Sequence, residues 1–100
     1  MQVFKVKISQ SVEDEIEHYV DEIAKDSVNN ALKWYGKTME MIYTLDNSPA
    51  RCPYADEMAF HDFEIRNLIF GQYRILFRIE GHTVQILHVK HGRMKRRPLE

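Results

Sequence analysis

The chain has 100 residues, of which 44% are hydrophobic and 29% are charged, so we expect one globular domain over residues 1–100. No apolar run approaches the ~20 residues that cross a bilayer, and the single Cys52 cannot form an intramolecular disulfide. These features favour a cytoplasmic protein without a membrane partner. The net charge of −1 hides an asymmetry, because residues 1–50 sum to −4 and residues 51–100 to +3.

The first half of the chain predicts a strand and two helices. Residues 2–8 alternate apolar and polar side chains, which is typical of a half-buried strand. Ser11, followed by Asp14, resembles a capping box and predicts a helix over residues 12–25. A second helix should follow from residue 28 to residue 45, with almost no linker. Two such helices form a hairpin.

The second half changes to a period of two. A loop is expected over residues 46–58, where Pro49 and Pro53 prevent helix continuation. Strands are expected over residues 63–70, 73–80 and 84–89, joined by turns at Gly71 and Gly81. The order β-α-α-β-β-β predicts a two-layer α+β domain, in which the helical hairpin packs on a mainly antiparallel sheet.

The same alternation predicts which side chains share the core. From the strands we expect Tyr73, Ile75, Phe77, Ile79, Val84 and Ile86. From the helices we expect Ile16, Val20, Leu32, Tyr35, Met39 and Ile42. Arg74 and Arg78 then lie on the opposite, solvent-facing side of the sheet.

Few residues suggest cofactor chemistry. The five histidines lack partners at zinc-like spacing, so we expect no metal site. Cys52 follows Arg51, which could make its thiol reactive, but a lone loop cysteine is more often a packing residue. A glycine-rich phosphate loop and a Gly-x-Ser-x-Gly elbow are both absent, so we expect no cofactor and no nucleotide hydrolysis or acyl transfer.

Basic residues are the persistent oddity of the second half. Two interpretations stay open. Arg66, Arg74 and Arg78 could form the solvated side of the sheet, paired with glutamates on neighbouring strands. They could instead join the basic C-terminal residues in a groove that binds a phosphate backbone or an acidic peptide. In that case the candidate binding residues are Arg66, Arg74, Arg78, Arg93, Lys95, Arg96 and Arg97.

Four segments carry a family resemblance. They are residues 49–53 (PARCP), 64–68 (EIRNL), 71–79 (GQYRILFRI) and 84–93 (VQILHVKHGR). In combination, and together with the helical hairpin, they resemble the RelE/ParE superfamily of toxins from type II toxin–antitoxin modules. The order β-α-α-β-β-β is also the order of this superfamily. The ending of the last strand and the Arg-Cys-Pro loop look more like the ParE-type, plasmid-stabilisation branch.

The resemblance implies a partner and offers two targets. It implies a cognate antitoxin that neutralises the domain, as part of a toxin–antitoxin hetero-oligomer. ParE-like members inhibit DNA gyrase, whereas RelE-like members cleave messenger RNA on the ribosome. If this chain is a ribonuclease, the matching residues are Glu64, Arg74, His88, His91 and Arg93. The chain lacks the late tyrosine of RelE, since no aromatic residue follows Phe77, so inhibition of gyrase without catalysis is the favoured hypothesis. A decayed module that retains only antitoxin binding is a third reading.

Overall fold

The computed structural model describes residues 3–92. The sheet forms from β1 (Lys5–Ile8), β2 (Arg66–Phe70), β3 (Tyr73–Glu80) and β4 (Thr83–His91). Its strand order is β1-β4-β3-β2, with β1 parallel to β4 and the other pairs antiparallel. The predicted element order and the mainly antiparallel sheet are therefore confirmed.

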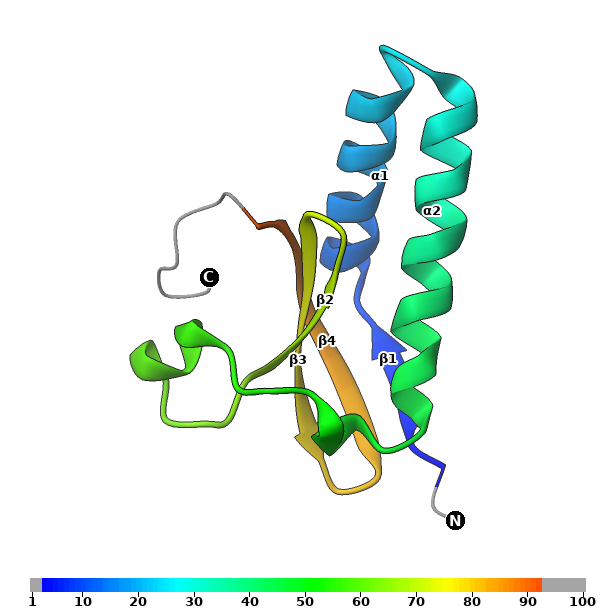
Figure 1. Ribbon diagram of the computed structural model, residues 1–100. Coiled ribbons are helices and arrows are strands. Elements are labelled where there is room, and N and C mark those ends of the chain that lie inside the picture. The colour runs from blue at the N-terminus through cyan, green and yellow to red at the C-terminus, as the bar shows by residue number, and fades with distance from the viewer. Residues whose placement is uncertain (1–2, 93–100) are drawn as a thin grey trace.

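The two helices form a hairpin on one side of this sheet (Figure 1). α1 (Gln10–Ala24) begins two residues before the predicted start, because Ser9 and not Ser11 is the N-cap and accepts the Val12 N–H. The sequence offers Asp26 or Ser27 as the cap of the second helix, and Ser27 caps α2 (Val28–Tyr43). A short 3-10 helix, Thr44–Asp46, follows α2.

The helix-side core contains most of the predicted strand residues. Ile75, Phe77, Val84 and Ile86 are buried there, and Ile79 packs against the same cluster. On the helices, Ile16 and Ile42 are buried, and Val20 and Met39 lie at the border. Apolar burial of this kind contributes about 25 cal/mol per Å².

Two helix residues of the predicted core are on the surface instead. Leu32 is 63% exposed and Tyr35 is 47% exposed. The buried face of α2 is rotated toward Ala31 and Thr38. Small side chains at these positions fit the close approach of the two helices, so the bulkier Leu32 and Tyr35 point outward.

A β-bulge in β4 corrects the predicted alternation. Phe77 pairs with Ile86 but Leu76 pairs with His88, so Leu87 is the additional residue. As a result, Val89 belongs to the helix-side core with Ile86, although the sequence pattern placed them on opposite faces.

The opposite face of the sheet is covered, which the sequence did not predict. The segment between α2 and β2 contains two more 3-10 helices, Pro49–Arg51 and Asp56–Phe60, and lies across this face (Figure 1). A second, smaller core forms there from Ala55, Ile65 and Leu76, with partly buried neighbours around it. The sheet is thus buried on both sides over part of its area.

Candidate functional site

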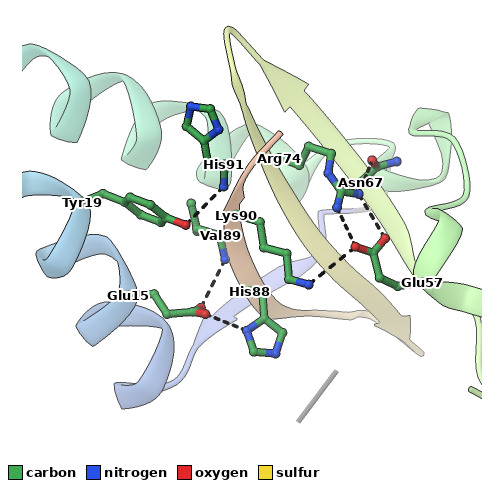
Figure 2. A network of polar contacts seen from close by, with 9 residues as sticks. All are labelled: Glu15, Tyr19, Glu57, Asn67, Arg74, His88, Val89, Lys90 and His91. Atoms are coloured by element: carbon green, nitrogen blue, oxygen red, sulfur yellow. Dashed lines mark hydrogen bonds and ion pairs between the residues drawn. The ribbon is translucent and has the colours of Figure 1, made fainter. Parts of the chain in front are cut away.

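A buried ion cluster lies under the covering segment (Figure 2). Glu57, in the 3-10 helix Asp56–Phe60, accepts hydrogen bonds from both terminal nitrogens of Arg74, at 3.1 and 2.6 Å. The ammonium of Lys90 lies 3.6 Å from the same carboxylate. Arg74 also donates to the Asn67 side chain at 3.3 Å. Because Arg74 pairs with Lys90 across β3 and β4, the register places both cations on one face.

Glu57 is the counterion of both Arg74 and Lys90, so the cluster as a whole keeps one positive charge. Glu57 is fully buried and the Arg74 side chain is 3% exposed. Burial alone raises the pKa of Glu57, but hydrogen bonding to Arg74 and the nearby charges of Arg74 and Lys90 outweigh it and lower that pKa. The expectation that Arg74 lies on a solvated face is wrong, because the covering segment supplies its counterion.

A second polar group joins α1 to the free edge of β4 (Figure 2). β1 pairs with β4 only as far as Ile86, and beyond that point side chains of α1 meet the outer backbone N–H groups of β4. The Glu15 carboxylate accepts the Val89 N–H at 3.3 Å and binds His88 Nδ1 at 2.8 Å. The Tyr19 hydroxyl accepts the His91 N–H at 3.2 Å. Two α1 side chains therefore take the place of a neighbouring strand.

The remaining sequence candidates lie elsewhere in the fold. Arg66 donates to the carbonyl oxygens of Ala50 and Cys52 and lies over the Tyr54 ring. Glu64 accepts the Tyr54 hydroxyl at 3.3 Å. These contacts tie β2 to the loop before it.

Two further candidates, Arg78 and His91, lie toward opposite ends of the paired strands β3 and β4. Arg78 lies over the Phe63 ring and bridges to Glu80 at 3.4 Å. His91 contacts Gln72 through its ring and packs edge-on against Tyr73. The four C-terminal candidates, Arg93, Lys95, Arg96 and Arg97, lie outside the described residues.

Arg66 and Glu64 share Tyr54 as a contact, whereas the other described candidates bind different partners. Arg74 meets Glu57 and Lys90, which the sequence did not single out. The sequence did contain a signal for this cluster. Arg74 and Lys90 each lie in an otherwise apolar strand, where burial of an unpaired charge would cost free energy. Glu15 and Tyr19 were hidden among the many polar residues of α1, because their partners are backbone groups more than 70 residues away in sequence.

Two grooves flank α1. The first lies between the helices, holds about 390 Å³, and is lined by Glu13, Ile16, Glu17, Val20, Tyr35 and Met39. We call it the hairpin groove. The second lies on the other side of α1, holds about 800 Å³, and includes Asp14, Glu15, His18, Tyr19, Glu22 and His91. We call it the acidic groove.

The described part of the chain offers no other special chemistry. Across residues 3–92, no three His, Cys, Asp or Glu side chains gather as a group that could hold a metal ion. Among the same residues, no helix is long and apolar enough to span a bilayer. Burial raises the pKa of the Cys52 thiol, so Cys52 is a poor nucleophile at neutral pH.

The α+β fold, with a helical hairpin against a four-stranded sheet, is that of small toxins from toxin–antitoxin modules. The family model described as the ParE toxin of the type II toxin–antitoxin system parDE matches residues 6–96. The match covers most of the sequence, so the chain belongs to the ParE toxin family.

Two solved structures have the same fold. One is a chain of the chromosomal ParDE toxin–antitoxin system from P. aeruginosa, with a TM-score of 0.73, 16% identity and coverage of 89% of this chain and 96% of that one. The other is from the toxin–antitoxin complex RelBE2 of Mycobacterium tuberculosis, with a TM-score of 0.63, 24% identity and coverage of 91% and 93%. The search of curated proteins gave no match.

Proposed function

We propose that this ParE-family toxin acts in the cytoplasm by binding and inhibiting DNA gyrase, and that it does not cleave RNA. The observation that carries the proposal is the state of Arg74. Its guanidinium is 3% exposed and both terminal nitrogens bind Glu57, so it does not present a free cation to a phosphate.

RNA cleavage through 2′-hydroxyl attack needs an acid, a base and cations around one phosphate. The described candidates are held by different elements. Glu64 binds Tyr54 in the loop before β2, and His88 binds Glu15 of α1. His91 binds Gln72 in the turn between β2 and β3. This dispersal supports a toxin that acts through its surface.

Two assays on the purified toxin test the target. We expect loss of supercoiling when the toxin is added to gyrase at near-stoichiometric ratio, and no cuts in a translated message followed by primer extension. The antitoxin, added first, should restore supercoiling. Codon-positioned cuts with gyrase unaffected would overturn the proposal. Glu64→Ala, Arg74→Ala and His91→Ala would then be the first variants to assay for lost cleavage.

We also propose the place where the antitoxin binds. The hairpin groove has an apolar floor, with Ile16 and Val20 from α1 and Tyr35 and Met39 from α2. Val28 and Leu32 extend this apolar surface along α2, where each is more than 60% exposed. Glu13 and Glu17 form an acidic rim. An amphipathic helix with apolar anchors and flanking lysines or arginines fits such a groove.

A matched pair of substitutions tests this surface. Tyr35→Glu places a charge in the hairpin groove and should weaken antitoxin binding at least tenfold in calorimetric titration. Tyr43→Glu is the control, because Tyr43 is similarly exposed on the same helix but does not line the groove. Equal loss in both variants, or in neither, would place the antitoxin elsewhere.

Growth of the host tests the module as a whole. Expression of the chain alone should arrest growth, and co-expression of the antitoxin gene beside it should restore growth. Normal growth at high expression of folded chain would contradict an active toxin and favour a decayed copy.

A further inference from the structure

We propose that the C-terminal basic segment, residues 93–100, docks on the acidic groove of α1 in the free protein. This inference does not depend on the target of the toxin. It concerns the side of α1 that faces away from the hairpin groove, where Glu15 and Tyr19 contact β4 and the acidic groove lies beside them.

The charge of α1 favours a cationic occupant. The helix contains six acidic residues and no lysine or arginine: Glu13, Asp14, Glu15, Glu17, Asp21 and Glu22. Two of them, Asp21 and Glu22, lie in the last turn, where the negative end of the helix dipole disfavours anions. A cation bound there would relieve this unfavourable placement.

The acidic groove presents one stripe of this helix. Asp14, His18 and Glu22 are spaced by four residues and therefore share a face. Asp14 accepts the Gln10 amide and Glu22 accepts the Lys25 ammonium, each at 3.0 Å. Both contacts are solvent-exposed and contribute little, so the two carboxylates stay available to a stronger partner.

The groove also has aromatic walls that suit guanidinium groups. Tyr19 and Tyr73 pack edge to face, with ring centroids 5.3 Å apart, and both line the groove. His91 packs against Tyr73 at 5.1 Å. Arginine stacks on such rings while its charge faces a carboxylate, which an isolated acidic patch would not offer.

The position of the chain end identifies the occupant. His91 itself lines the groove, and its backbone N–H binds Tyr19 at the middle of α1. The next residues include four cations, Arg93, Lys95, Arg96 and Arg97. Five extended residues reach about 17 Å, whereas Asp14 and Glu22 are about 12 Å apart along the helix. The segment can therefore meet either end of the stripe.

Docking in this way would give the segment two alternative acidic partners. In the free toxin the segment binds α1 of its own chain. In a complex, an acidic surface of another protein must compete with α1 for the segment. The cost of displacement would make binding through the segment dependent on the charge of the acidic groove.

Paramagnetic relaxation in the full-length toxin tests the proposal. A nitroxide is attached at Leu99→Cys, and the buried Cys52, whose thiol pKa is raised, stays unlabelled. We expect the backbone amides of residues 14–22 to lose at least half of their intensity. The loss should be relieved by 0.5 M salt and by Asp14→Lys/Glu22→Lys, in which circular dichroism verifies the fold.

The controls separate the other outcomes. Glu13→Lys/Glu17→Lys makes the same change of charge on the stripe facing the hairpin groove and should leave the intensity loss in place. A mixed sample contains nitroxide-labelled chain at natural isotope abundance and ¹⁵N chain without nitroxide. Broadening in this sample reports contacts between copies. Unaffected α1 amides, relief by both double variants alike, or broadening only in the mixed sample would each overturn the proposal.

Discussion

Arg74 shows how a side chain that resembles a binding residue can serve the fold. Its strand neighbours Ile75 and Phe77 are fully buried on the helix side, while Arg74 itself points toward the covering segment. There it holds the 3-10 helix Asp56–Phe60 against the sheet through Glu57. A buried ion pair of this kind adds little net stability over apolar packing, but the loss of one partner is costly.

Glu57→Gln should therefore destabilise the protein by about 3–5 kcal/mol, because Arg74 and Lys90 would be left as buried cations without a counterion. Urea unfolding measures this loss. Glu57→Leu/Arg74→Met/Lys90→Met, which removes all three charged groups of the cluster, should be less destabilising than Glu57→Gln. The opposite order would show that the pair itself, and not the orphaned charge, determines stability.

The same carboxylate predicts a pH dependence. Its pKa is lower in the folded protein than the ordinary value of about 4.3, so the wild type is stabilised above that pH and loses this stability as the pH falls through the folded-state pKa. Unfolding measured between pH 6 and pH 3 should show a steeper decline for the wild type than for Glu57→Gln. Parallel curves would contradict a depressed pKa at Glu57.

Phe77→Ala should cost roughly 3–5 kcal/mol, because Phe77 is completely buried in the helix-side core. Ile69→Ala is the control from the neighbouring strand, where Ile69 is 59% exposed, and should change stability by about 0.5 kcal/mol or less. Chemical denaturation of both variants decides whether the sheet face is assigned correctly. Similar midpoints for the two variants would contradict the assignment.

Among the elements, α1 has an unusual task. It packs on the sheet through Val12 and Ile16 and also closes the edge of β4 beyond the end of β1. Glu15 and Tyr19, one turn apart, reach backbone N–H groups of Val89 and His91. The helix thus replaces a strand along a stretch of sheet edge, which limits edge-to-edge association there.

Tyr19→Phe tests this arrangement, because it removes the hydroxyl that accepts the His91 N–H. It should cost about 0.5–1.5 kcal/mol and speed the hydrogen exchange of the His91 amide, while Val89, held by Glu15, exchanges as before. Glu17→Gln, on the other groove, is the control and should change neither amide. An unchanged His91 rate would mean that water replaces the hydroxyl without loss.

Across the whole molecule, charge is distributed unevenly along the chain. The acidic residues concentrate on α1 and the basic ones in the second half of the sequence, so the net charge of −1 is the sum of −4 in residues 1–50 and +3 in residues 51–100. An acidic helix of this kind attracts cationic partners. The hairpin groove and the acidic groove lie on the two sides of the same acidic helix.

Removal of residues 93–100 should weaken binding of the antitoxin or the target, and should flatten its salt dependence between ~0.05 and 0.2 M, because exposed charges are screened over this range. Titration calorimetry at several salt concentrations measures both quantities. Arg93→Gln/Arg96→Gln, which keeps the length, should reproduce part of the change. Unchanged affinity and salt slope in the truncated chain would assign the segment no role in binding.

The sequence determined the element order, most of the core and the family. Strand and helix geometry are local, so each leaves its own period in the sequence. This period is two in residues 73–80 and 3.6 in residues 12–25. For the same reason Ile75, Phe77, Val84 and Ile86 were predicted correctly as core residues. The resemblance to toxins rested on whole strands and is confirmed by the family match over residues 6–96.

The tertiary structure alone decided three features: the bulge in β4, the buried face of α2 and the counterion of Arg74. The bulge at Leu87 shifted the alternation of β4 by one residue, and it is defined by the pairing of β4 with β3, which the sequence of β4 alone does not specify. Leu32 and Tyr35 kept the helical period but lost the core to Ala31 and Thr38, since the close packing of two helices selects small side chains. Arg74 gained Glu57 from a segment 17 residues away, because the desolvation of a charge is settled by whatever counterion the fold brings near it.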